Sequence, residues 1–320
     1  MMQKNQSENH KFKNRYLPYL IYILLITFLS KTTYAQQAPH YTQYLYNMEV
    51  LNPAFVGSKS DLSISLLSRQ QWVGIEGAPT TTTFSIGGRT IAGFGLGATV
   101  IKDKIGLTTS TNVNIDASYT IPTSRYGRVS FGLKGGLTFF NNNLASGITP
   151  DNEVYASTEG NFPNIGFGGL FYNKNFFIGV SAPNVLKSNQ YKTLVNVNEN
   201  YGINISNYFL TSGYIFNLSD NLKFKPSTIV KYTSSLPISV DINSNFIYDN
   251  KIEAGLSYRH ENSISALFAI IINKKYRVGY SYDYTLADYG NNLSSHEIIL
   301  RFDLDLNRST HWLFHNRCFF

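Results

Sequence analysis

The sequence predicts an all-β fold, a transmembrane antiparallel β-barrel of about 14 strands with an N-terminal lead-in or plug segment. The first observation is alternation: the runs YRVGYSYDY (276–284) and IILRFDLDL (298–306) place an apolar side chain at every second position. Successive side chains of a strand point to opposite faces, and this pattern recurs along most of the chain. The second is that only 15% of the residues are charged, against about 25% in ordinary soluble domains. The third is an aromatic content of 15%, which suits the rims of a membrane barrel, although soluble sandwiches are also rich in Tyr.

Residues 1–35 have the pattern of a signal peptide that is cleaved after Ala35. Basic residues precede an apolar stretch at 17–29, and Thr33-Tyr34-Ala35 follows as a small-x-small cleavage site. The stretch is shorter than the roughly 20 residues of a spanning helix, and an uncleaved anchor is the alternative. Residues 1–35 carry five basic residues and one acidic one, so cleavage lowers the formal net charge from +7 to +3. The mature chain therefore gives no support for a nucleic-acid partner.

Residues 36–60 lack the strand pattern and are predicted to plug the barrel or to form a periplasmic lead-in beneath it. Several tyrosines precede the motif LNPAFVG at 51–57. Pro53 restricts Asn52 to extended conformations, and Gly57 can adopt a positive φ. The motif is therefore expected to form a tight turn that seats the lead-in inside the barrel, with direct contact to a secreted partner as the alternative.

Alternating segments then follow from residue 61 to residue 306, and a tail occupies 307–320. An even number of strands is expected for a bacterial single-chain barrel. The predicted strands cover 61–70, 80–88, 92–103, 106–121, 126–141, 161–173, 175–183, 207–217, 221–233, 236–248, 250–259, 263–272, 275–284 and 294–306.

The polar face of these strands is predicted to line the lumen. A midplane Arg or Lys that faces lipid costs about 2–4 kcal/mol, so the apolar face must meet the lipid. The segment 263–272 is apolar on both faces, and there we expect the lead-in or a loop to fill the lumen. Short turns at 173–174 and 273–274 indicate the periplasmic side, whereas the long polar segments 142–160 and 184–201 are predicted extracellular loops that contact a partner.

No pattern of catalytic, cofactor-binding or metal-binding residues emerges. The Gly-rich runs at 93–97 and 166–169 do not open a helix, so they are expected to relieve crowding in the lumen rather than to hold a phosphate. Only His311 and His315 have a close metal-like spacing, and they lie in the tail. Cys318 is the single cysteine and has no partner. We therefore predict a protein that is not an enzyme.

Four segments resemble the PorP/SprF family: QQAPHYTQYLYNMEVLNPAFVGS (36–58), SRQQWVGIEGAPTTTTFSIGG (68–88), YRHENSISALFAI (258–270) and SSHEIILRF (294–302). The similarity runs over nearly the whole mature chain, although the C-terminal RCFF lacks the proline of the family's usual tail. The positions that match the family pattern are Asn52, Pro53, Ala54, Gly57, Gln71, Trp72, Gly74, Gly77, Ala78, Pro79, His296 and Glu297.

The resemblance implies a component of the type IX secretion and gliding-motility machinery of Bacteroidota, located in the cell outer membrane. The implied role is to assist the export or surface retention of a partner protein. The implied partners are outer membrane lipid, other secretion components including periplasmic lipoproteins, and a secreted surface protein or its C-terminal domain. No cofactor is implied.

Two other functions remain open at the level of sequence. A channel or transporter for small or hydrophobic solutes would require a continuous lumen. An outer-membrane lipid hydrolase would require a nucleophile beside His296, and no such motif is evident.

Overall fold

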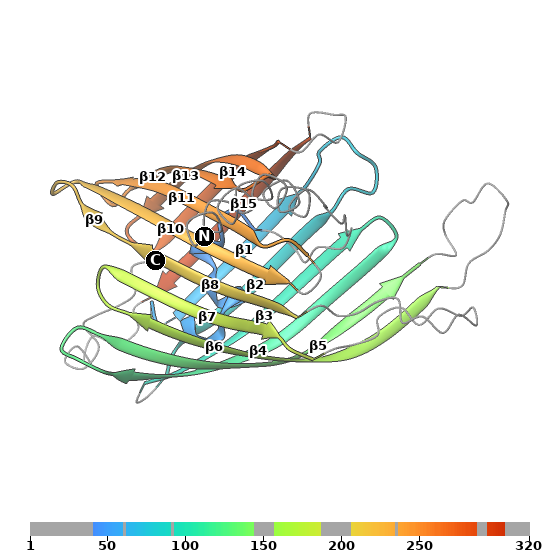
Figure 1. The fold of residues 1–320 in the computed structure, drawn as a ribbon, viewed down its shortest axis with the longest axis horizontal. Coiled ribbons are helices and arrows are strands. Elements are labelled where there is room, and N and C mark those ends of the chain that lie inside the picture. The colour runs from blue at the N-terminus through green and yellow to red at the C-terminus, as the bar shows by residue number, and fades with distance from the viewer. Residues whose placement is uncertain are drawn as a thin grey trace, which may run out of the picture. The chain divides into compact units, whose positions relative to one another are not determined.

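The computed structural model describes residues 41–59, 62–90, 93–143, 157–186, 206–233, 236–286 and 293–304. In these residues one antiparallel sheet closes on itself, because β10 pairs with β11 and β1 pairs with β15 (Figure 1). Both β8 and β9 pair with β10, so they are two parts of one barrel strand. The described residues thus form a closed barrel with 14 strand positions. The predicted signal peptide and the C-terminal tail lie outside them.

The strands of this sheet follow one another round the barrel in chain order. They are Leu62–Gln70 (β1), Thr80–Arg89 (β2), Phe94–Ile105 (β3), Thr108–Pro122 (β4), Arg128–Asn142 (β5), Thr158–Tyr172 (β6), Phe176–Asn184 (β7), Asn207–Tyr214 (β8), Phe216–Asn217 (β9), Leu222–Thr233 (β10), Ser239–Tyr248 (β11), Ile252–Arg259 (β12), Ser263–Ile272 (β13), Tyr276–Thr285 (β14) and Ser294–Leu304 (β15). The predicted fold class is confirmed, and every predicted strand boundary falls within about three residues of an observed one.

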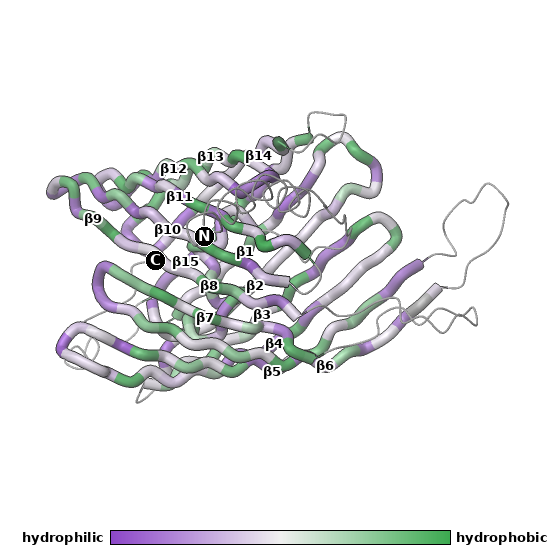
Figure 2. Tube along the Cα trace, in the orientation of Figure 1, coloured by the Kyte–Doolittle hydropathy of each residue, from purple (hydrophilic) through white to green (hydrophobic). Residues whose placement is uncertain are grey.

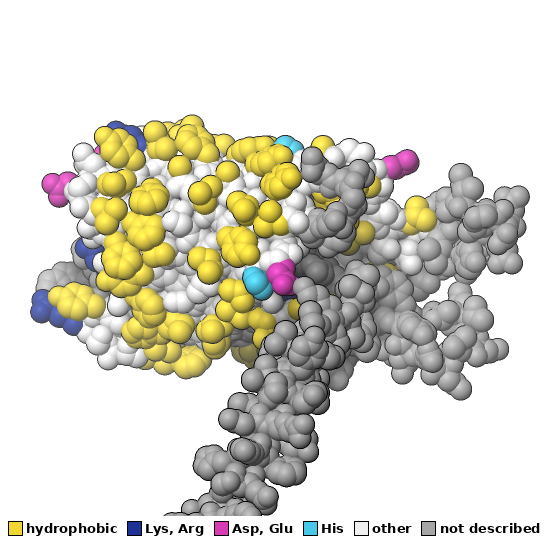
Figure 3. Space-filling model, turned by 45° about the horizontal axis from the view of Figure 1, so that its top comes forward, with side chains coloured by type: hydrophobic (Ala, Val, Ile, Leu, Met, Phe, Trp, Pro, Cys, Tyr) yellow, Lys and Arg dark blue, Asp and Glu magenta, His cyan; other side chains and the backbone are white. Residues whose placement is uncertain are grey.

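The apolar face of each strand points outward, as the energetic argument requires. On β12, Leu256 is 62% exposed at the outer surface, whereas Glu253 is fully buried in the lumen. Figure 2 shows this alternation along the tube, and Figure 3 shows apolar side chains spread over the face in view. The lipid-facing surface is therefore built by the period-two pattern alone.

We expect an arginine on this outer face to destabilise the barrel strongly. Leu256→Arg, near the middle of β12, should lower the free energy of unfolding by about 2–4 kcal/mol in lipid vesicles. Leu218→Arg, in the turn between β9 and β10, carries the same charge to the rim and should cost far less. Urea titration of both variants measures the difference, and equal losses would contradict a lipid-facing β12.

The two ends of the barrel differ in their connections. At the end we call the short-turn end, residues 273–275 join β13 to β14, and Asn273 and Lys274 there have φ near 52° and 58°, the left-handed conformation that tight hairpin turns use. At the opposite end, which we call the loop end, the connections β5–β6 and β7–β8 are long. Most of the predicted loops 142–160 and 184–201 lies outside the described residues.

Residues 41–59, which we call the inner segment, lie in the lumen. They form three short helices, η1 (Tyr44–Tyr46), α2 (Met48–Leu51) and η2 (Pro53–Phe55). No helix of the described residues is long and apolar enough to cross a membrane. All residues of the inner segment except Tyr41, Gly57 and Lys59 are buried.

The inner segment forms the apolar core of the barrel. Its aromatic and aliphatic side chains pack with inward residues of the wall, including Leu267 on β13. Leu267, Ala269 and Ile271 are the inward apolar positions of the strand whose two faces are both apolar, and the first two are buried. The inner segment thus explains why this strand lacks a polar face.

Candidate functional site

The Asn52-Pro53 motif fixes the inner segment against the wall. Asn52 has an extended backbone, with φ −144° and ψ 110°, and its Oδ1 accepts a hydrogen bond from Ala54 N at 2.9 Å, which caps η2. Its Nδ2 donates to the carbonyl oxygens of Gly169 on β6 and Val180 on β7, at 3.2 and 3.3 Å. One buried amide therefore caps a helix and anchors it to two strands.

Glycines on the lumen face of the wall make room for this motif. A Cβ at Gly132 on β5 would overlap the backbone of Pro53 and Ala54, and one at Gly168 on β6 would overlap the Asn52 amide. Gly57 has φ +74°, and a Cβ there would lie 3.0 Å from Gly95 Cα. The Gly-rich runs of the sequence thus include positions where the inner segment contacts the wall at backbone distance.

A buried ionic cluster holds the start of the inner segment. Glu297 on β15 accepts hydrogen bonds from the backbone N–H groups of Thr42 and Gln43, at 3.0 and 2.7 Å. Arg69 Nη1 on β1 lies 3.1 Å from Glu297 Oε2 and 2.6 Å from Asp283 Oδ2 on β14. The Thr42 hydroxyl donates to Asp283 Oδ2 at 2.7 Å. One cation thus pairs with two carboxylates, both of which also bind the inner segment.

A second cluster surrounds Tyr46. Glu253 on β12 pairs with Lys225 on β10 at 2.7 Å and with Arg277 on β14. The Arg277 guanidinium lies 4.4 Å from the centre of the Tyr46 ring, within the range of a cation–π interaction. Arg301 on β15 donates to the Tyr46 carbonyl oxygen. Charged groups from four strands therefore meet at one residue of the inner segment.

Polar contacts to the inner segment continue farther round the wall, on β2, β4 and β5. Ser85 on β2 donates to the Glu49 carboxylate at 2.9 Å. Lys134 on β5 pairs with Asp116 on β4 at 2.9 Å and donates to the Glu49 carbonyl oxygen at 3.4 Å. The inner segment is thus hydrogen-bonded around the circumference of the wall, which holds it more firmly than apolar packing alone.

The remaining motif residues lie elsewhere and have other roles. Residues 71–79 form the β1–β2 connection at the loop end, where Gln71 N donates to Pro79 O at 2.9 Å. Gly77 has φ +74°, and its carbonyl accepts from Gly106 N at 2.8 Å, which ties this loop to the β3–β4 turn. The Trp72 N–H donates to Ser295 Oγ at 3.4 Å. These residues shape the rim at the loop end.

His296 and Glu297 are adjacent in sequence but lie on opposite faces of β15. Glu297 points into the lumen, whereas His296 is half-buried on the outer face, where its Nδ1 lies 2.7 Å from the Tyr280 hydroxyl. Alternation separates the two side chains, so they cannot act on one reacting group. Within the described residues, no three His, Cys, Asp or Glu side chains are grouped to hold a metal. His311, His315 and Cys318 lie outside those residues.

The alternating pattern predicts that Glu253, Arg259, Arg277 and Asp283 belong to the polar, lumen-facing set, but it does not join them into clusters with the inner segment. Opposite charges at paired positions of neighbouring strands are a signal that the sequence does carry. Asp241 on β11 is paired with Arg259 on β12, and Asp116 on β4 is paired with Lys134 on β5. The Arg69–Glu297 pair also stands in register, but only once β1 is paired with β15.

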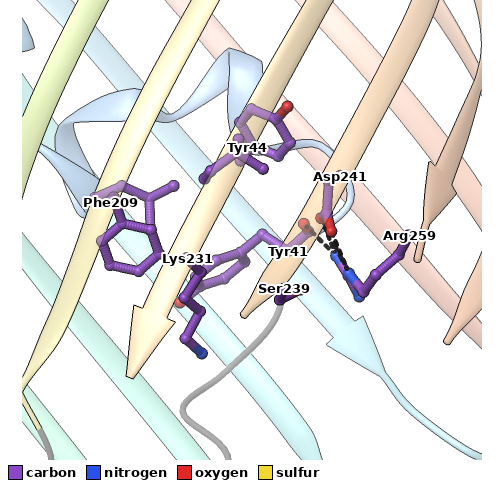
Figure 4. A pocket seen from close by; sticks show the side chains of 9 residues that line it. Tyr41, Tyr44, Phe209, Lys231, Ser239, Asp241 and Arg259 are labelled. Atoms are coloured by element: carbon purple, nitrogen blue, oxygen red, sulfur yellow. Dashed lines mark hydrogen bonds and ion pairs between the residues drawn. The ribbon is translucent and has the colours of Figure 1, made fainter. Parts of the chain in front are cut away.

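The described lumen contains a small pocket of about 30 Å³ between the inner segment and strands β8, β10, β11 and β12 (Figure 4). Arg259 on β12 donates from Nε and Nη2 to the Asp241 carboxylate, at 2.7 to 3.0 Å, and to the Tyr41 carbonyl at 3.3 Å. The lining residues are Tyr41, Tyr44, Leu51, Phe209, Ile229, Lys231, Ser239, Asp241 and Arg259.

A closed antiparallel barrel with an apolar exterior and a charged, filled lumen defines an outer-membrane β-barrel protein. The family model for the type IX secretion system membrane protein PorP/SprF matches residues 33–302. The chain belongs to this family.

Several solved barrels are similar in structure. The Acinetobacter baumannii outer membrane protein Omp33 aligns with a TM-score of 0.46 and 9% identity, covering 78% of this chain and 100% of that one. The CymD monoaromatic hydrocarbon channel aligns with a TM-score of 0.46 and 12% identity, over 81% and 93% of the two chains. The Ralstonia pickettii toluene transporter TbuX aligns with a TM-score of 0.44 and 10% identity, over 79% and 92%. No curated protein sequence matches the chain significantly.

Proposed function

We propose that this protein is a non-enzymatic accessory of type IX secretion that binds a partner protein at its rims and loops, and so assists the export or surface retention of that partner. The observation that carries the proposal is the occupied lumen, because the inner segment is hydrogen-bonded to the wall on all sides. Membership of the PorP/SprF family supports a place in the type IX secretion system. With the interior occupied, the ends of the barrel are the surfaces that remain for a partner.

The matched motif residues have a structural role in this proposal. Asn52, Pro53, Ala54 and Gly57 seat the inner segment as a plug, and residues 71–79 shape a rim that a partner can contact. Periplasmic lipoproteins and a secreted surface protein or its C-terminal domain are the partners we propose.

The channel alternative requires the inner segment to leave the lumen. Its departure would strip Glu297 of two backbone donors and Asn52 of two wall carbonyls. Each buried polar group that loses its partner costs about 1–3 kcal/mol unless water replaces the partner. Opening the lumen to solutes would therefore incur the free-energy cost of several such lost hydrogen bonds at once.

A disulfide between the inner segment and the wall, which we call the covalent lock, distinguishes the secretion accessory from the solute channel. A Cβ at Gly87 on β2 would lie 3.5 Å from Val56 Cγ1, so a sulfur at the γ position of residue 56 would lie next to the side chain of residue 87. Val56→Cys with Gly87→Cys, in a Cys318→Ser background, should tie the inner segment to the wall. We expect oxidised cells of a complemented deletion strain to display the surface protein as the parent does.

Single-cysteine variants serve as matched controls for the lock, and non-reducing gels report its formation. Loss of surface display on oxidation, restored by reductant, would contradict a function that leaves the inner segment in place. Crosslinking and co-purification from native membranes then test the partner claim. Recovery of secretion components or a surface protein supports it, and their absence despite intact display would contradict it.

A further inference from the structure

Four neighbouring turns at the short-turn end carry an excess of positive charge. They join β6 to β7, β9 to β10, β11 to β12 and β13 to β14, and the structure describes every residue in them. Asp249 pairs with Lys251 at 2.5 Å, so these two charges cancel. Asp220 is the other acidic residue of these turns. Against it stand three further turn lysines and the second residue of β10, which together we call the basic mouth: Lys174, Lys274, Lys275 and Lys223.

The carboxylates just inside this end do not neutralise the basic mouth. Glu253 already pairs with two cations, Lys225 and Arg277, and Asp303 pairs with Arg301. Four lysines against one aspartate therefore leave three positive charges at the mouth. Figure 3 shows Lys and Arg side chains at the left of the molecule, which is the end where these turns lie in Figure 1.

The lysines of the basic mouth converge from different parts of the rim. Strand order places Lys174 and Lys274 on opposite sides of Lys223 round the barrel. The charges of both nevertheless act on Lys223, and charge repulsion in salt water extends over only about 10 Å. Lys223 Nζ donates a hydrogen bond to Asn250 Oδ1 at 2.7 Å, which holds it at the β11–β12 turn. The three ammonium groups thus lie together at the end of the barrel.

Aromatic side chains, rather than lysines, face the membrane at this level. The ring of Phe224 on β10 lies between Phe216 on β9 and Phe246 on β11, with centroids 6.1 and 4.9 Å away. Such rings form the interfacial girdle of a membrane barrel. Lys223 directly precedes Phe224, so alternation turns it to the lumen side, like the buried Lys225. The basic mouth is therefore directed along the barrel axis and away from lipid.

We propose that the basic mouth binds an acidic segment of a periplasmic protein, whose carboxylates pair with its lysines. Bacterial outer-membrane barrels turn their short connections toward the periplasm. A surface with three uncompensated positive charges attracts a partner of opposite charge and rejects a basic one. The inference rests on the proposed function, because it assigns a protein partner of that function to the short-turn end.

Fluorescence anisotropy of a labelled decaglutamate peptide, added to the purified barrel in detergent, tests this surface. We expect saturable binding that weakens about tenfold or more when salt rises from about 0.05 M to about 0.5 M, because salt screens exposed charges. Lys174→Glu with Lys274→Glu should weaken binding about tenfold or more, since like charges now meet. Lys174→Arg with Lys274→Arg keeps the charge and should retain binding.

Lys102→Glu with Lys104→Glu is the matched control, because it makes the same change of charge on exposed residues of β3 at the loop end. This barrel should bind decaglutamate as the wild type does, and a heat-dependent shift in gel mobility confirms that each variant is folded. No saturable binding to the wild type, or equal losses in the two glutamate variants, would overturn the proposal. So would phosphatidylglycerol that co-purifies with the wild type and is lost from Lys174→Glu with Lys274→Glu while decaglutamate fails to bind, which would assign the lysines to lipid headgroups.

Surface display in a complemented deletion strain separates this inference from the proposed function. We expect Lys174→Glu with Lys274→Glu to reduce display of the surface protein and Lys174→Arg with Lys274→Arg to preserve it. Full display with the folded glutamate variant, in a strain whose deletion abolishes display, would overturn the role of the basic mouth and leave the proposed function standing. Full display in the deletion strain itself would instead contradict the proposed function.

Discussion

Gly132→Val is expected to displace the inner segment from the lumen. The added Cβ overlaps the backbone of Pro53 and Ala54, which cannot yield as the end of a flexible side chain can. Overpacking a core typically costs about 1–3 kcal/mol of stability, occasionally more. Because this clash is with main chain, we expect the loss of stability in Gly132→Val to lie at the upper end of that range or above it. Val56, which is 2% exposed, should become accessible with the segment that carries it.

The measurement is maleimide labelling of Val56→Cys in a Cys318→Ser background. We expect labelling to be slow in the parent and fast with Gly132→Val. Gly135→Val provides the matched control, because Gly135 lies on the same strand with nothing within 4 Å of an added Cβ. Equally slow labelling in a folded Gly132→Val barrel would show that the inner segment does not pack at Gly132.

Arg69→Met should cause the largest electrostatic loss in the barrel. Removal of this guanidinium leaves Asp283 and Glu297 buried together without their cation. Breaking a buried ion pair by removing one partner costs about 3–5 kcal/mol. We expect a loss of that size in urea unfolding, together with faster labelling of Val56→Cys, because the cluster also binds Thr42 and Gln43.

Neutralising the two carboxylates should restore part of this loss. In the triple variant Arg69→Met, Asp283→Asn and Glu297→Gln, neither position 283 nor position 297 carries a buried charge that has lost its cation, so the free energy of unfolding should recover towards that of the parent. Lys251→Met, at an exposed turn, controls for the change of charge. A triple variant less stable than Arg69→Met alone would show that the ionic cluster is not the cause.

Alternation of apolar and polar residues was sufficient to predict the strands and their faces. On β12, Glu253 and Arg259 face the lumen, and Leu256 faces outward, as the pattern requires. A strand with a period of two can be oriented in only two ways, with its apolar side chains outward or inward. The lipid on one side determines which orientation is correct. Pro53 and Gly57 restrict the backbone around Asn52, which is extended in the structure, while Gly57 has φ +74°.

The ionic clusters were not predictable from the same pattern. Arg277 on β14 meets Glu253 on β12 across the intervening β13, so the pairing depends on strand tilt and on the space that Tyr46 occupies. Arg69 and Glu297 are 228 residues apart and become neighbours only when the first strand closes against the last. These distances follow from barrel closure, which local sequence does not specify.

Single-channel recording on the purified wild-type barrel in planar bilayers tests the central claim, that the inner segment closes the lumen. We predict no steady ohmic conductance from the wild-type barrel and from Gly135→Val, and steady conductance from Gly132→Val. Steady ohmic conductance from the wild-type barrel would contradict a closed lumen and favour the solute channel.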